Sequence, residues 1–149
     1  MTPPPLEIPA DVVDAMLAHC LREAPLECCG LLGGVSPRVS SIHPLRNTSA
    51  SPVRYDADPR DLIAAVVSLR NRGAEILAIY HSHPAHAAIP SRVDLAENHY
   101  GDVPRLIVSL VGPEPDVRVW RLATDSYEEL PWRRVPTTPV DVEPGPSAR

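Results

Sequence analysis

The sequence predicts a single α/β domain in which helices flank a mixed β-sheet. Three observations carry this prediction. The chain has 149 residues, which is a length typical of one domain. Hydrophobic residues make up 44% of it and charged residues 22%, as in ordinary soluble globular proteins. Segments with helical and strand periodicity follow one another in the order α-β-β-α-β-α-β-β, which is typical of helices packed on a sheet.

A proline-rich segment opens the chain, and a helix follows it. Residues 1–9 are predicted to be an irregular lead-in. From Asp11 onward, apolar residues recur at steps of three and four, the spacing of one helix face. The predicted buried face consists of Val13, Met16, Leu17, Cys20, Leu21 and Ala24. Pro25 ends the helix because proline cannot continue it without losing a hydrogen bond. His19 is interpreted as a surface or hydrogen-bonded histidine and not as a ligand.

Two strands joined by a short turn come next. The segment 27–35 is rich in glycine, which inside a strand often marks a bulge or a close approach to the backbone. A second strand is predicted over 38–45, and it is expected to pair with the first as a hairpin across Ser36 and Pro37. The polar residues 46–54 are expected to form a loop.

The second helix has clear start and stop signals. Asp58 can cap its free N–H groups, Pro59 suits the first helical position, and Asp61 favours the positive end of the helix dipole. Gly73 is a typical residue just beyond a helix end. The strand that follows, 75–82, is apolar enough to lie in the centre of the sheet.

The last third of the domain is predicted to contain one short helix and three strands. The helix starts at Ser91, and the strands cover 105–111, 117–122 and 127–130, the last as an edge strand. These elements place the domain at residues 6–132. The remaining residues, 133–149, contain several prolines and little apolar periodicity, so they are predicted to be a flexible tail.

Charge and cysteine content exclude several classes of protein. The net charge is −5 and the basic residues form no dense run, so neither a nucleic-acid nor a membrane partner is expected. An odd number of cysteines (Cys20, Cys28 and Cys29) does not resemble a disulfide framework and favours a reducing compartment. Without a signal peptide or an apolar run long enough to span a membrane, the chain is expected to be cytoplasmic.

A metal site is predicted at the end of the central strand. His81 and His83 are two residues apart, so their side chains lie on one face of a strand about 6.6 Å apart. Neutral imidazoles at this spacing suit Zn²⁺, and Asp94 can supply a third ligand. A purely structural zinc site would need a fourth protein ligand. None is evident nearby, and Cys28 and Cys29 are not interpreted as ligands, so the open position predicts bound water and chemistry.

Two of the candidate residues have plain structural interpretations as well. Ser91 and Asp94 form an S-x-x-D pattern, the signature of a capping box at a helix start. A rigidly held cap residue also suits a metal ligand. Glu27 lies far upstream in the sequence and, taken alone, is interpreted as a solvated carboxylate. His86 and His99 are expected to be solvated or to contact the ligands without binding the metal themselves.

Taken together, these residues resemble the JAMM (MPN+, Mov34/PAD-1-like) zinc metalloprotease family, in its compact prokaryotic form. The resemblance rests on the strings E-x-C-G-L-L-G from Glu27 and I-Y-H-S-H-P-x(5)-P-S-x-x-D ending at Asp94, and it spans Ile8 to about Trp132. It implies a cytidine-deaminase-like α/β fold. The P-C-x-x-C half of a zinc deaminase site is absent, which disfavours deamination.

The resemblance also implies a role for each site residue. His81, His83 and Asp94 would be the zinc ligands. Glu27 would hold the water, take its proton and pass it to the leaving group, and Ser91 would hydrogen-bond the oxyanion of the tetrahedral intermediate.

For the substrate, the resemblance implies a hydrolase acting at the C-terminus of a ubiquitin-like protein. The compact chain suits a sulfur-carrier protein as substrate, with release of cysteine as one such activity. A general deconjugase (isopeptidase) and a non-catalytic scaffold are the alternatives. The segment 27–35 is expected to form one wall of the cleft by β-augmentation. The sequence makes no prediction of oligomeric state.

Overall fold

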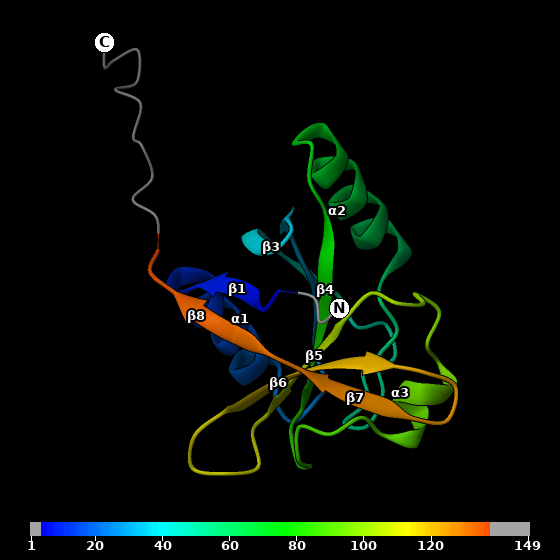
Figure 1. Cartoon of the computed structure of the whole chain (residues 1–149). Helices are drawn as coiled ribbons and strands as arrows, with labels where there is room; N and C mark the ends of the chain where they lie inside the picture. Colours follow the sequence, from blue (N-terminus) through cyan, green and yellow to red (C-terminus); the bar gives the residue numbers. More distant parts are fainter. Residues whose placement is uncertain (1–3, 138–149) are drawn as a thin grey trace.

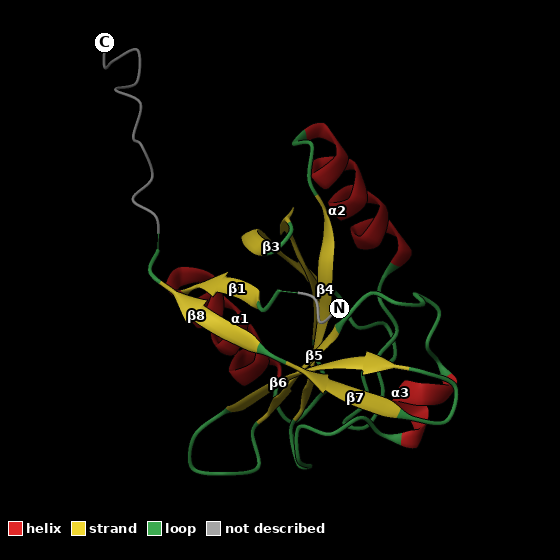
Figure 2. Cartoon of the chain, in the orientation of Figure 1, coloured by secondary structure: helices red, strands yellow, loops and turns green. Residues whose placement is uncertain are grey.

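The computed structural model describes residues 4–137 and contains one eight-stranded sheet with three helices (Figures 1 and 2). The strands are β1 Leu6–Pro9, β2 Cys29–Val35, β3 Arg38–Leu45, β4 Glu75–His83, β5 Arg105–Ser109, β6 Asp116–Leu122, β7 Tyr127–Leu130 and β8 Trp132–Val135. The helices are α1 Ala10–Glu23, α2 Pro59–Asn71 and α3 Arg92–Ala96. The predicted α/β class with a mixed sheet is confirmed.

The strand that carries the two histidines lies in the middle of the sheet. The strand order is β7-β6-β5-β4-β2-β3-β1-β8. β4 is antiparallel to β2 and parallel to β5, and its last seven residues are buried. The strand therefore has a hydrogen-bonded neighbour on each side, as predicted from its apolar sequence, and the histidine-bearing end pairs with β5.

The two longer helices contact opposite faces of the sheet. Alternate residues of β4 point to opposite faces, so Tyr80 packs in the same apolar cluster as α1 residues, whereas Ile79 packs in a second cluster with Ala65 of α2. His81 and His83 are two and four residues from Ile79, so their side chains point to the same face of the sheet as Ile79. The histidines therefore lie on the α2 side of the sheet, while Tyr80 and Ser82 face the α1 side.

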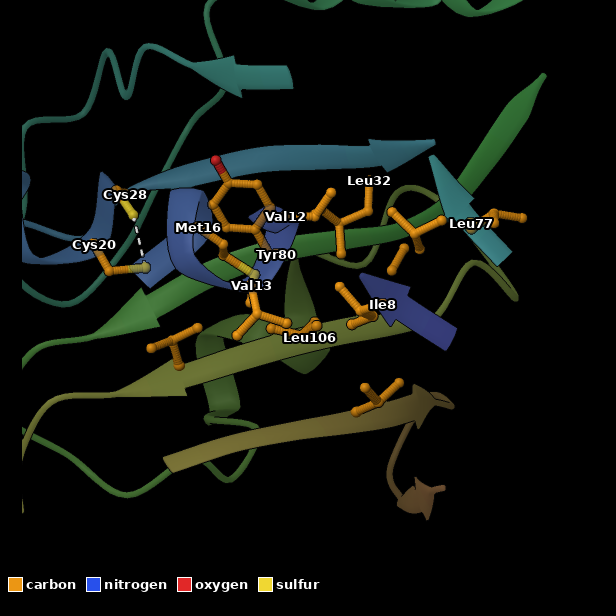
Figure 3. Packing of buried hydrophobic residues seen from close by; sticks show 14 residues of the cluster. Ile8, Val12, Val13, Met16, Cys20, Cys28, Leu32, Leu77, Tyr80 and Leu106 are labelled. Carbon is orange, nitrogen blue, oxygen red and sulfur yellow. Dashed lines mark hydrogen bonds between the residues drawn. The ribbon is translucent and has the colours of Figure 1, made fainter. Parts of the chain in front are cut away.

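The core under α1 differs from the sequence prediction in two respects. The helix buries Val12, Val13, Met16, His19 and Cys20, several of which are visible in Figure 3. Leu21 and Ala24, expected on this face, are exposed, because Leu21 points outward from the last turn and Ala24 lies beyond the helix end.

Glycine 30 allows a close approach, as its position in a strand predicted. A Cβ atom at Gly30 would overlap the Tyr80 ring, so glycine lets the aromatic ring lie directly against β2. The predicted hairpin of β2 and β3 is also confirmed, with a register shift between Gly33 and Gly34.

The two ends of the described chain extend the sheet further than the sequence predicted. The lead-in prediction for 1–9 is wrong in part, because β1 is a strand that pairs in parallel with β8 and also contacts β3. β8 carries the sheet to Val135, beyond the predicted domain end at residue 132, and β7 forms the predicted edge strand. The rest of the predicted tail, from residue 138, lies outside the described residues. No helix of the described part is long and apolar enough to cross a membrane.

Candidate metal centre

The end of β4 brings the two predicted histidine ligands together. His81 and His83 are both buried, and their Nε2 atoms lie 3.2 Å apart. His83 Nδ1 lies 2.8 Å from the carbonyl oxygen of Ala87. Since a carbonyl only accepts, Nδ1 must donate, which leaves the Nε2 lone pair of a neutral His83 imidazole directed at His81 and away from the loop.

The short helix α3 supplies the third predicted ligand. Its first turn is a capping box: the Asp94 N–H donates to Ser91 Oγ (3.0 Å), and the Ser91 N–H donates to Asp94 Oδ2 (2.8 Å). These bonds orient the Asp94 carboxylate, whose two oxygens lie 3.2 Å from His81 Nε2 and 3.1 Å from His83 Nε2. The predicted capping box is therefore confirmed, and it leaves the Asp94 carboxylate facing both histidines.

A shared cation accounts for this cluster better than hydrogen bonds alone. Two imidazole nitrogens and a carboxylate lie mutually 3.1–3.2 Å apart, and a single proton can bridge only two of these groups. Ligands arranged tetrahedrally at about 2.0–2.1 Å from zinc lie about 3.3–3.4 Å from one another. Among the described residues, these three side chains form the only group of this kind with ligand atoms close enough for one metal ion. The donor set therefore fits Zn²⁺ with one open position.

The electrostatics of Asp94 fit a ligand. Burial would raise the pKa of its carboxyl, but the charge of His81 and the hydrogen bonds with both histidines hold that pKa well below its usual range. Burial acts to lower the pKa of His83, but the hydrogen bonds with Asp94 and Ala87 and the charges of Asp94 and Glu27 together raise it. A carboxylate that stays ionised is what a divalent cation requires.

The pKa of Glu27 is shifted in the opposite direction to that of Asp94. Its side chain is buried, and its Oε1 atom has no hydrogen-bond partner among the described residues. Burial raises the pKa of this carboxyl to about 8, while the charges of His83 and Asp94 act on it in opposite directions. Glu27 therefore lies within electrostatic range of the metal cluster, and it is not the solvated carboxylate that its isolated position in the sequence favoured.

Hydrogen bonds from two neighbouring segments fix the backbone around Glu27. Its N–H donates to the Ser51 carbonyl (2.8 Å) and its carbonyl accepts from Asn47 Nδ2 (3.0 Å). The next residue, Cys28, exchanges hydrogen bonds with Ser82 of β4, between the two histidines. The base candidate is thus tied to the ligand strand through Ser82.

Sequence reasoning missed two residues that shape the site. Tyr55 stacks on His81 with ring centroids 4.7 Å apart and planes inclined by 28°. Asn47 holds the loop beside Glu27 through four hydrogen bonds made by one side chain. Both lie in or next to the segment that was predicted only as a polar loop, and no local pattern marks either one.

The cysteines and the other histidines lie outside the metal cluster. Cys28 Sγ contacts Cys20 Sγ at 3.4 Å (Figure 3), and Cys29 Sγ points toward the Leu45 carbonyl. His86 and His99 are exposed. His19 is buried and its Nδ1 pairs with the Tyr80 hydroxyl at 2.7 Å, as expected for a hydrogen-bonded histidine.

Two cavities border the candidate site: Asp94 contributes to the lining of one, and Glu27 to the lining of the other. The first, which we call the Asp94 cavity, has a volume of about 170 Å³ and is lined by Asp94, Tyr55 and Tyr100 among others. The second, which we call the Glu27 cavity, has a volume of about 410 Å³ and is lined by Glu27 together with the end of α1 and residues 44–50.

One prediction about the cleft is wrong. The segment 27–35 cannot add a substrate strand by β-augmentation, because β2 is paired with β3 on one edge and with β4 on the other. Its preceding residues, Glu27 and Cys28, are also hydrogen-bonded, to Ser51, Asn47 and Ser82. No free edge remains there for a peptide.

Comparisons with known proteins agree on one kind of domain. The family model described as prokaryotic homologues of the JAB domain matches residues 9–123. A probable TtuB-protein conjugate cleaving protease of Thermus thermophilus is 43% identical over 93 residues, which is 62% of each chain and thus less than two thirds of that protein. The CysO-cysteine peptidase of Mycobacterium tuberculosis is 33% identical over 129 residues, 85% of this chain and 88% of that protein. A solution structure of a Desulfitobacterium hafniense protein aligns with a TM-score of 0.82 at 31% identity, covering 90% of this chain and 95% of that one.

Proposed function

Because this chain belongs to the family of prokaryotic JAB-domain proteins, we propose that it is a zinc-dependent hydrolase that cleaves an amide bond at the C-terminus of a ubiquitin-like protein. The predicted resemblance is confirmed, since solved JAB1/MPN domains share the fold. In this proposal residues 6–132 hold the catalytic domain, with β8 completing its sheet.

One observation carries the proposal: a buried carboxylate oxygen without a partner lies within electrostatic range of a ready-made ligand set. Leaving a buried carboxyl oxygen unsatisfied costs about 1–3 kcal/mol or more. A purely structural metal site gives no reason for this cost. A hydrolase does, because its base must have a lone pair free for water. A non-catalytic scaffold likewise has no need of an unsatisfied buried carboxyl oxygen.

His81, His83 and Asp94 would hold the zinc ion, which would supply Lewis acidity for activating water near neutral pH and polarising the scissile carbonyl. Glu27 holds the attacking water through Oε1 and takes its proton. Burial raises the affinity of its carboxylate for a proton, as the acceptor of the water's proton requires. When the C–N bond breaks, Glu27 passes that proton to the leaving nitrogen, and the oxygen of the water stays on the acyl carbon.

Ser91 would contribute a hydrogen bond to the oxyanion. Its Oγ already accepts from the Asp94 N–H, so its hydroxyl proton stays available as a donor. Donors of this kind contribute about 2.7–4 kcal/mol each to transition-state stabilisation. The capping box holds this donor in place before substrate arrives.

The substrate class follows from the relatives and from the size of one cavity. One relative is a peptidase for a CysO-cysteine conjugate, and another is a protease for TtuB-protein conjugates. The Asp94 cavity, at about 170 Å³, is smaller than the range of about 300–1,000 Å³ typical of ligand pockets. It suits a tail without side chains, such as Gly-Gly. We place the sulfur-carrier conjugate first among substrates and a general protein conjugate second.

The test is mass spectrometry of small ubiquitin-like carriers with C-terminal extensions after Gly-Gly, incubated with the zinc-loaded chain. Cleavage directly after Gly-Gly that a chelator abolishes and zinc restores is the expected result. A matched carrier with a bulky residue in place of the last glycine should resist cleavage. If the zinc-loaded chain processes no carrier, the scaffold alternative replaces this proposal.

A further inference from the structure

The charges of the Glu27 cavity point to a specific leaving group. Besides Glu27, the charged residues in its lining are Arg22, Glu23 and Arg46. Neither Arg22 nor Arg46 makes a side-chain hydrogen bond or ion pair within residues 4–137, although other exposed arginines, such as Arg118 and Arg121, do so. Two guanidinium groups without a side-chain partner among these residues therefore border the cavity whose lining includes Glu27, together with the carboxylate of Glu23.

The chemistry of amide hydrolysis says which part of the substrate this cavity receives. The base delivers its proton to the leaving nitrogen, so the leaving amine must lie within reach of Glu27. The acyl side of the bond has to extend elsewhere, and the Asp94 cavity is the other space that opens at the site. The Glu27 cavity is thus the place for whatever is attached through the leaving nitrogen.

The backbone of Arg46 is held firmly enough to present its side chain. Its N–H donates to Asp61 Oδ2 at 2.9 Å, and its carbonyl accepts from the Asp58 N–H at 2.8 Å. The next residue, Asn47, is bonded to the Glu27 carbonyl. The backbone of Arg46 is therefore connected to that of Glu27 through the hydrogen bond of the neighbouring Asn47.

Arg22 approaches the cavity from the last turn of α1. Its positive charge acts on the Tyr80 hydroxyl, which pairs with His19, another residue of the cavity lining. Arg22 and Arg46 thus come from two separate elements. A carboxylate is the group that guanidinium recognises with the most favourable geometry.

We propose that the Glu27 cavity binds the α-carboxylate of a single amino acid attached to the C-terminus of a carrier protein, with Arg22 and Arg46 as the cationic partners. This inference rests on the proposed function. At about 410 Å³ the cavity falls within the range of small-molecule pockets. It selects a one-residue leaving group, because a lysine inside a protein conjugate carries no free α-carboxylate.

The kinetic test compares two substrates that differ in one group. A carrier that ends in Gly-Gly-Cys is prepared with a free C-terminal carboxylate or with a carboxamide, and kcat/KM is measured with the zinc-loaded full chain. The acid is expected to be cleaved about tenfold faster. Arg46→Met and Arg22→Met should each lower kcat/KM for the acid and narrow the ratio of acid to amide. Arg70→Met, an exposed arginine of α2 outside this cavity, should keep the wild-type ratio.

A binding test separates this inference from the proposed function. Metal-free, isotope-labelled protein is titrated with S-methylcysteine and with its carboxamide, and amide signals are followed by NMR. The free acid alone should shift the signals of Arg22, Arg46 and Asn47, and Arg46→Met should remove the effect. Equal shifts with both compounds, or none, would overturn the subsite, as would equal kcat/KM values. If no carrier is cleaved but the acid still binds selectively, the subsite holds and the proposed reaction fails.

Discussion

Asp94 and Glu27 are two buried carboxylates whose charges both act on His83, yet their own pKa values are shifted in opposite directions. Asp94 accepts bonds from the Ser91 N–H and meets both imidazoles, which hold its pKa far below the usual range. Glu27 has an unpartnered oxygen and a pKa raised to about 8. The difference in hydrogen bonding supports the proposed roles, because Asp94 is held by three partners whereas Glu27 keeps one oxygen free.

The largest effect should come from Asp94→Asn. Loss of the negative charge removes one of three ligands, so zinc content should fall from about one ion per chain toward zero, and hydrolysis should fall with it. Metal analysis of the purified protein measures this, and His83→Ala should behave alike. If Asp94→Asn keeps its full zinc content, the assignment of Asp94 as a ligand is wrong.

Glu27→Gln should separate chemistry from metal binding. The amide has the shape of the carboxyl but cannot take a proton, so kcat should drop by about 10²–10⁴-fold while zinc content and the fold stay as in the wild type. Steady-state kinetics measure kcat of the variant and the wild type, metal analysis measures their zinc content, and circular dichroism compares their folds. An active variant would contradict the assignment of Glu27 as the base.

Ser91→Ala should have the next largest effect, on two properties at once. The missing oxyanion donor should lower kcat by about 10²–10³-fold, and the missing cap should lower the free energy of unfolding by about 1 kcal/mol. Ser91→Thr is the control, since a hydroxyl remains for both purposes. If Ser91→Ala lowers the free energy of unfolding but leaves kcat unchanged, Ser91 acts only as a helix cap and not as an oxyanion donor.

A pH experiment on the metal-free protein tests Glu27 directly. Its pKa is about 8 in the folded state against an ordinary value of 4.5, so the folded state binds more protons between these limits. The free energy of unfolding should therefore fall as pH rises from about 4.5 to 8. Glu27→Gln should lack this contribution, and the difference between the two denaturation series isolates it. Parallel pH profiles would contradict the raised pKa.

Asn47→Ala should have the smallest effect. This side chain holds the backbone carbonyl of Glu27 at 3.0 Å, so its loss should lower kcat severalfold through a less defined position of the base, with zinc content unchanged. The lost hydrogen bonds should reduce the free energy of unfolding by about 1–2 kcal/mol. Asn47→Asp keeps the side-chain oxygen that accepts hydrogen bonds but loses the amide donor. Its kcat therefore shows whether the hydrogen bond to the Glu27 carbonyl contributes to catalysis. Wild-type kcat in both variants would show that Asn47 does not position the base.

How far the sequence predicts the site depends on how local each contact is. His81 and His83 share a strand face through a two-residue period, and Asp94 follows within one loop and one helical turn, so spacing alone predicted three ligands. Glu27 could not be placed by spacing, because β2 has to pair with β4 before residue 27 approaches residue 83. Only the family resemblance supplied it.

The same distinction accounts for the errors in the fold. β1 has little intrinsic strand pattern, and its parallel partner β8 begins at Trp132, so no local signal marked it. The β-augmentation prediction for 27–35 required a free strand edge, and edges are decided by the order of strands in the sheet. Tyr55 was missed because a loop residue is placed by tertiary packing.

The position of β1 has a consequence for synthesis of the protein. β1 bonds to β3 and β8, so one edge of this strand stays unpaired until residues 132–135 have been synthesised. During translation β1 has an unsatisfied edge, which is the kind of surface that seeks pairing with other chains. The parallel pairing of these two distant segments means that this edge of the sheet is completed only after nearly all of the described domain has been made.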